Sequence, residues 1–130
     1  MKDETAIRTL IEQWAENTRS GALDRVLDGH AADAVIYDVL PPVQYIGTAA
    51  YRQSWDDWQP QTQGELRFEV QGLRIHAGEQ VAFAYGLIHC GGTLQGGNTF
   101  EDWVRATFCL EQHDGQWRIT HQHISMPHGA

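Results

Sequence analysis

The sequence predicts an α+β fold in which about three N-terminal helices pack on a curved, mostly antiparallel sheet. Apolar residues recur at helical spacing through most of the first 58 residues, and strand-like alternation begins near residue 65. Four strand-like segments then follow with short connections. Helices and strands that segregate in this way are typical of α+β proteins. The 130 residues suit one domain, spanning 1–130, with a single core.

The charge balance excludes several classes of partner. The chain has 9 Lys and Arg residues against 17 Asp and Glu residues, a net charge of -8, which disfavours nucleic acid and anionic membrane surfaces. No apolar run approaches the roughly 20 residues that a membrane span needs. The N-terminus is charged at once and lacks the apolar region of a signal peptide, so we expect a cytoplasmic protein.

The predicted helices precede the sheet. Residues 3–19 form an amphipathic helix, and 22–29 are predicted to form a second short one. A short strand at 35–39 stops before Pro41-Pro42, since proline cannot donate to a strand ladder. A third helix begins near Gly47-Thr48, and its Tyr51 and Trp55, four residues apart, share a face.

The predicted strands cover 65–77, 80–91, 101–112 and 116–125. Asp114-Gly115 is a strong hairpin signal between the last two strands. The glycine-rich segment 91–98 reads as a mobile hairpin loop, with a pocket lid as the alternative. Cys90 and Cys109 fall toward opposite ends of the preceding hairpin, too far apart for a disulfide, so both are expected to be buried thiols.

The last strand carries the most informative pattern. Because side chains alternate across a strand, one face is predicted to carry Trp117, Ile119, His121, His123 and Ser125. A two-residue turn pairs residues whose numbers sum to 229, which sets His121 opposite Phe108 and His123 opposite Ala106, on the core face. A one-residue bulge would instead bring Arg105 and Thr107 onto that face. The first register is favoured because it groups the apolar residues.

The two imidazoles have three interpretations. They shuttle protons or bind substrate, since histidine titrates near neutrality, or they are core residues satisfied by Ser125, tyrosine or backbone groups. A metal site is disfavoured because no third ligand is evident, and no metal is expected. Asp38 is likewise either a base beside apolar residues or a turn-capping residue. Trp14, Tyr51 and Trp55 are either core or pocket lining.

The element order and local sequence resemble the NTF2-like superfamily, specifically its SnoaL-like and ketosteroid-isomerase-like members. The resemblance runs from IEQWAENTRSGALDRVLDGHAADAVIYDV through YIGTAAYRQSW to DGQWRITHQHISMP. That ending is also similar to the association domain of calcium/calmodulin-dependent protein kinase II. The resemblance implies a cone-shaped fold, but it does not choose a function because this fold hosts enzymes, transport factors and assembly domains.

The ketosteroid-isomerase resemblance implies roles for particular positions. Asp38 stands where that family has its catalytic base. Trp14 occupies the position of the oxyanion-hole tyrosine, and Thr107 or Phe108 that of a protonated aspartate. Since an indole donates no phenolic proton and neither other residue is an acid, two of the three signature groups are missing. His121 or His123 could serve as donors in their place.

Two hypotheses follow. In the first, the chain is an enzyme that needs no cofactor and transfers a proton next to a carbonyl of a small apolar molecule, giving isomerisation, cyclisation or dehydration. Its catalytic residues would be Asp38, His121 and His123, and its substrate-binding residues would be Trp14, Tyr51, Trp55, Phe108 and Ser125. In the second, the chain is a non-catalytic ligand-binding or oligomerisation domain. Both hypotheses predict a homodimer, since an uncovered sheet face is usually buried.

Overall fold

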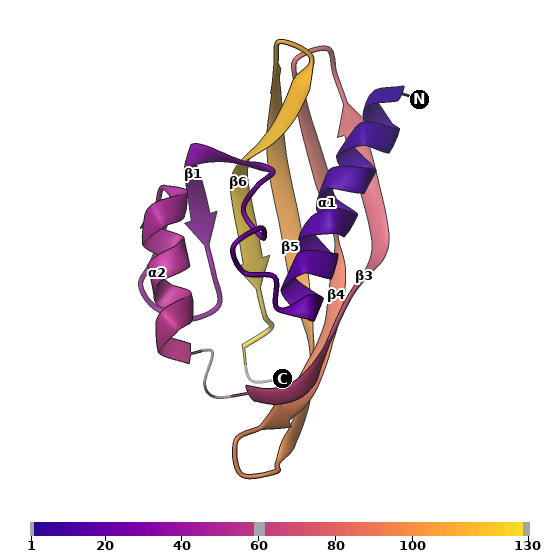
Figure 1. Cartoon of the computed structure of the whole chain (residues 1–130). Coiled ribbons are helices and arrows are strands. Elements are labelled where there is room, and N and C mark those ends of the chain that lie inside the picture. The colour runs from indigo at the N-terminus through magenta and orange to yellow at the C-terminus, as the bar shows by residue number, and fades with distance from the viewer. Residues whose placement is uncertain (1, 59–61, 129–130) are drawn as a thin grey trace.

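The computed structural model describes residues 2–58 and 62–128 and confirms the α+β fold class. Within these residues, two helices pack against a six-stranded sheet in the order β2-β1-β6-β5-β4-β3 (Figure 1). All neighbouring strands are antiparallel except β1 and β6, which run parallel. The elements are α1 (Lys2–Ser20), β1 (His30–Tyr37), β2 (Tyr45–Ile46), α2 (Thr48–Trp58), β3 (Thr62–Ala77), β4 (Val81–Leu94), β5 (Thr99–His113) and β6 (Gln116–Ser125).

The core lies between the sheet and the helices, on what we call the inner face. Helix α1 crosses the long strands, and α2 lies beside β1 (Figure 1). Ile7, Ile11 and Trp14 recur at helical spacing and are buried. The Trp14 ring makes edge contacts with Phe68, at 5.3 Å between ring centroids, and with Phe108, at 5.1 Å. Trp14 therefore joins α1 to β3 and β5.

The second predicted helix, at 22–29, is wrong. These residues form successive turns, in which the Arg25 amide donates to the Ala22 carbonyl and the Asp28 amide to the Arg25 carbonyl. Helix α1 ends where Gly21 adopts a φ of 77°, a left-handed conformation that suits glycine after a helix. The Asn17 side chain donates to the Arg25 carbonyl. It therefore holds the turns against α1 without a second helix.

The hairpin turn between β5 and β6 is confirmed, but the predicted register holds only beside it. Asp114 and Gly115 have φ values of 53° and 78°, as a two-residue hairpin turn requires. Leu110 pairs with Ile119, in line with the sum of 229. The register then shifts by one residue at a bulge, so that His121 pairs with Cys109 and not with Phe108, and His123 pairs with Thr107 and not with Ala106.

This bulge reverses the predicted direction of the last part of β6. Gln122 and Ile124 now lie on the buried inner face, whereas His123 is exposed on the outer face. The register without the bulge would bury two imidazoles and expose Ile124. The observed register buries one amide and one aliphatic side chain, which costs less desolvation than burying two imidazoles.

Three further sequence predictions can be compared with the structure. Strand β1 begins at His30, earlier than predicted, and Asp38 follows its last residue. Both cysteines are free, and Cys109 pairs with Phe83 while Cys90 pairs with Asp102, as expected for opposite ends of a hairpin. No helix in the described part of the chain is long and apolar enough to cross a membrane.

Candidate functional site

Asp38 and Tyr51 form a hydrogen-bonded pair between the end of β1 and the first turns of α2. The buried Tyr51 hydroxyl donates to Asp38 Oδ2 at 2.6 Å. The other carboxylate oxygen accepts from the Val39 amide at 2.7 Å. Asp38 is half-buried. One charge-assisted hydrogen bond thus fixes the carboxylate, and the other satisfies the backbone where β1 ends.

Aromatic rings surround this pair on one side. Tyr51 contacts Tyr45 of β2 at 5.1 Å and Trp55, one turn along α2, at 5.2 Å, both edge to face. Burial raises the pKa of the Tyr51 phenol well above its ordinary value, and the Asp38 charge raises it further. Tyr51 therefore remains a protonated donor at neutral pH.

The predicted histidine pair lies on the other side of the sheet. The His121 Nδ1–H donates to the Val35 carbonyl at 2.7 Å, and its ring contacts Tyr37 at 4.6 Å. His123 is exposed and contacts the same tyrosine at 5.3 Å. Ser125 accepts a hydrogen bond from Arg105 at 3.1 Å. His121 therefore has a backbone hydrogen-bond partner, and the predicted core-face position of the two histidines is wrong.

The predicted site residues thus fall into three separate groups. Asp38, Tyr51 and Trp55 lie together at α2. Trp14 and Phe108 pack against each other in the core, with Phe108 fully buried. His121, His123 and Ser125 lie on the outer face, on the opposite side of the sheet from the Asp38–Tyr51 pair. The structure does not bring the histidines and Asp38 into one cavity.

A buried polar pair was missed by the sequence reasoning. His30 begins β1, and its Nε2 lies 2.8 Å from Oε1 of Gln122, which is fully buried on β6. The bulged register considered in the sequence analysis was expected to bring Arg105 and Thr107 onto the core face. The structure instead leaves both residues exposed and turns Gln122 inward. His30 carried no comparable signal, because the predicted strand began after it.

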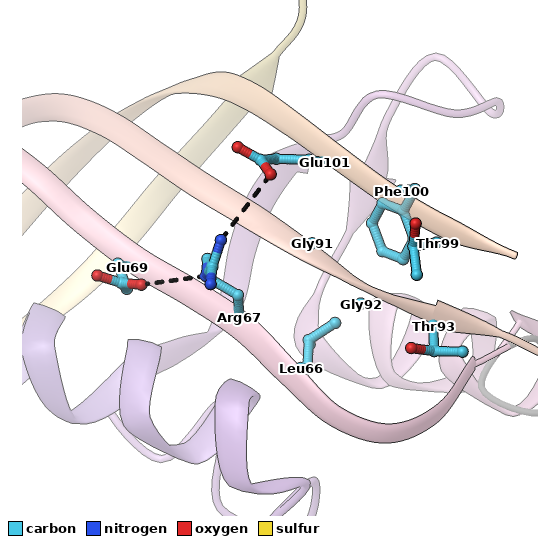
Figure 2. Close-up of a pocket in the computed structure, with 9 residues that line it drawn as sticks. All are labelled: Leu66, Arg67, Glu69, Gly91, Gly92, Thr93, Thr99, Phe100 and Glu101. Carbon is cyan, nitrogen blue, oxygen red and sulfur yellow. Dashed lines mark ion pairs between the residues drawn. The ribbon is translucent and has the colours of Figure 1, made fainter.

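One surface groove, about 500 Å³, lies over β3, β4 and β5 near the glycine-rich hairpin that joins β4 to β5 (Figure 2). Arg67, Gly91 and Glu101 are side by side in the sheet. Because Gly91 has no side chain, the Arg67 guanidinium passes over it to Glu101 at 3.9 Å, and Arg67 also pairs with Glu69 at 3.5 Å. Two carboxylates thus surround this cation, so the groove offers no free positive charge for an anionic ligand.

The second groove, about 340 Å³, lies between α1 and residues 25–30, with Trp14 and His30 among its lining residues. Neither groove includes Asp38 or Tyr51. Among residues 2–58 and 62–128, no cluster of three or more His, Cys, Asp or Glu side chains forms a metal-binding set.

The fold defines a class of α+β proteins in which helices cover one face of a strongly curved sheet. Residues 7–129 match the SnoaL-like domain family. An NTF2-like protein of unknown function from Pseudomonas putida KT2440 is 30% identical, with a TM-score of 0.86 over 97% of this chain and 87% of that one. The chain therefore belongs to the SnoaL-like domain family of the NTF2-like superfamily.

More distant structures share the fold alone. One, from Xanthomonas campestris, is named for a calcium/calmodulin-dependent protein kinase II association domain, with 18% identity and a TM-score of 0.79 over 95% of this chain and 87% of that one. Another, from Novosphingobium aromaticivorans DSM 12444, is named as a proposed scytalone dehydratase. It is 12% identical, with a TM-score of 0.84 over 96% of this chain and 84% of that one. No curated protein matches the chain significantly.

Proposed function

We propose that the chain is an enzyme that transfers a proton next to a carbonyl group of a small, largely apolar substrate. Isomerisation, cyclisation and dehydration all proceed through such a step. The observation that carries the proposal is the 2.6 Å hydrogen bond from the buried Tyr51 hydroxyl to Asp38. A carboxylate held by a phenol beside aromatic rings combines a base, a proton donor and an apolar surface.

In the proposed step, Asp38 takes the proton from the carbon next to the carbonyl. The C–H electrons move into the carbonyl, and its oxygen becomes an enolate. Protonation removes the charge on Asp38, so the Tyr51 O–H loses its anionic partner and is free to donate to the enolate oxygen. Return of the proton to another carbon completes an isomerisation. This proposal assigns oxyanion stabilisation to Tyr51, and not to His121 or His123, because Tyr51 is the one of these three residues that is hydrogen-bonded to Asp38.

Hydrogen–deuterium exchange at the acidic carbon of 2-tetralone, followed by NMR in D₂O, tests the proposal. We expect the wild-type protein to accelerate exchange, and Asp38→Asn to remove about 100-fold or more of that acceleration, the contribution of a positioned base. Tyr51→Phe should cause a smaller loss. Asp114→Asn is the matched control, because it makes the same change in an exposed turn where asparagine tolerates the positive φ.

The proposal fails if wild-type protein does not accelerate exchange, or if Asp38→Asn exchanges 2-tetralone as fast as the wild type. Circular dichroism of each variant separates loss of the base from loss of the fold. A slow but folded Asp38→Asn protein is the outcome that supports the assignment.

A second function, assembly, is favoured by the outer face of the sheet. Val81, Phe83, Tyr85 and Leu87 alternate along β4 with their side chains exposed, and Trp103 on β5 is 49% exposed. Phe83 stacks against His76, at 4.7 Å between ring centroids, and Tyr85 lies 6.4 Å from Phe83 and 6.1 Å from His76. An apolar face of this extent is typical of a protein interface. We propose that a second copy of the chain covers it, which is compatible with either an enzyme or a binding domain.

A further inference from the structure

The interior contains two polar atoms that lack hydrogen-bond partners. Among the side chains that the structure describes, these buried atoms are His30 Nδ1 and Gln122 Nε2. His30 is 5% exposed and Gln122 is 0% exposed. Since a buried polar group without a partner destabilises the folded state, such atoms in a folded protein call for an explanation.

The hydrogen bond between the two side chains defines what each remaining atom offers. Gln122 Oε1 is an acceptor, so His30 Nε2 carries the proton and donates to it at 2.8 Å. Burial lowers the pKa of His30, which keeps the imidazole neutral near pH 7. His30 Nδ1 is therefore a bare acceptor, and Gln122 Nε2 has two hydrogens to donate. Within the described part of the chain, no donor therefore reaches His30 Nδ1, and no acceptor reaches the Gln122 Nε2 hydrogens.

His30 lies at the edge of the groove between α1 and residues 25–30, about 340 Å³ in volume. Two polar side chains of that groove have partners, since Gln13 donates to Asn17 at 3.1 Å and Asn17 donates to the Arg25 carbonyl at 3.1 Å. Leu10, Trp14 and Val26 supply apolar and aromatic surface. The groove thus combines apolar surface with an unsatisfied imidazole, and the polar side chains of Thr9, Arg25 and Asp28 also line it.

We propose that this groove and the His30 imidazole, which Gln122 holds in place, form a binding site for a phenol-class molecule, an aromatic ring that carries a hydroxyl group. The hydroxyl is a small uncharged group that donates its proton to Nδ1, the imidazole nitrogen that points away from Gln122. A carboxylate is excluded because it has no proton for Nδ1. Leu10 lines the groove and packs over Gly29, the residue before His30, so we infer that it turns when the hydroxyl reaches the buried imidazole.

This site is separate from the Asp38–Tyr51 pair. None of the residues that line the groove contacts Asp38 through a described hydrogen bond, and the groove is formed by α1 and the turns, not by α2. The proposal therefore stands or falls independently of proton transfer at Asp38. It describes a second ligand site.

Binding of 2-naphthol and 2-methoxynaphthalene, measured by fluorescence titration, tests this site. The two probes share a ring system, but only 2-naphthol can donate to His30 Nδ1. We expect the wild-type protein to bind 2-naphthol about 10-fold more tightly, the effect of one good hydrogen bond. The double variant His30→Leu/Gln122→Leu should bind both probes equally and should unfold at the same or a higher temperature, because removing both polar partners is nearly neutral or stabilising.

Matched controls separate the site from general effects. His113→Leu makes the same change at an exposed position of the β5–β6 hairpin and should keep the preference for 2-naphthol. Asp38→Asn should also keep it, which distinguishes this site from the proposed catalytic base. If the double variant does not fold, the ¹⁵N resonance of His30 Nδ1 in the wild type gives an independent readout, because it must shift when 2-naphthol donates to it.

Four results would overturn the proposal. The wild type could bind neither probe, or bind both equally. The double variant could retain the preference for 2-naphthol. The His30 Nδ1 resonance could stay unchanged at saturating 2-naphthol, which would mean that the ligand does not reach this nitrogen.

Discussion

Gln122 and His123 are neighbours in β6, yet they lie on opposite faces of the sheet and under opposite physical demands. Gln122 is fully buried and must find its partners inside the protein, where it has His30. His123 is exposed beside Tyr37, and water can satisfy its ring nitrogens. The inner face therefore buries a few polar side chains that must find partners within the protein, whereas the outer face is broad, aromatic and exposed to water.

Strand β4 differs from β6 because apolar residues occupy both of its faces. Ala82, Ala84 and Ile88 point into the core, and the large apolar side chains of Phe83 and Tyr85 point to the outer face. An antiparallel strand with one face in water normally alternates apolar and polar residues. Strand β4 is apolar on both faces, which is expected of a strand with a second covered surface.

The largest effect expected from this contrast comes from removing the same side chain on each face. Phe108→Ala on the inner face should lower the free energy of unfolding by about 3–5 kcal/mol, because it leaves a cavity beside Trp14. Phe83→Ala on the outer face, where the ring is 47% exposed, should cost less than about 1 kcal/mol in the monomer. Urea titration at low protein concentration measures both, and equal losses would contradict the distinction between the faces.

A charge on the outer face should break the proposed dimer without unfolding the chain. We expect Trp103→Lys to weaken self-association by about 2 kcal/mol or more, roughly 30-fold in Kd, as loss of a central aromatic residue does. Gln53→Lys, exposed on α2, is the control and should leave association unchanged. Sedimentation equilibrium gives both values. A wild-type protein that stays monomeric at high micromolar concentration would refute the dimer.

The smallest effect concerns pH and the inner face. The pKa of His30 in the folded chain lies below its ordinary value of 6.5 because burial disfavours the charged form. Below pH 6.5 the unfolded chain takes up the proton first, so this contribution to stability is present above 6.5 and is lost as pH falls. The loss is at most about 1.4 kcal/mol per pH unit for one proton. Urea titrations at pH 7.5 and 5.5 should show a smaller difference in His30→Leu than in the wild type or His113→Leu.

The periodic parts of the fold were predictable from the sequence because local pattern determines them. Four alternating segments gave β3 to β6, and Asp114-Gly115 gave the turn. Asp38 and Tyr51 were both singled out, and the structure brings them together. Their contact was not predictable, because it depends on how α2 docks beside β1.

The errors arose where a single residue changes the geometry. The bulge in β6 is one extra residue, and the sequence fits either register locally. The choice depends on the burial of Gln122 and Ile124 against elements far away in the chain. Likewise, residues 22–29 have helical spacing, but Asn17 satisfies their backbone from outside and stabilises turns.

The position of β6 between β1 and β5 has a consequence for biosynthesis. Strand β1 reaches the rest of the sheet only through β6, its parallel neighbour. During translation, the segment that carries Asp38 and Tyr51 is therefore made before its sheet neighbour β6. In the meantime β3, β4 and β5 can already pair as antiparallel hairpins. Only when the final ten-residue strand leaves the ribosome can it insert between the two halves and join them. The Asp38–Tyr51 pair therefore joins β3, β4 and β5 only after β6 has been made, although its residues precede those strands in the chain.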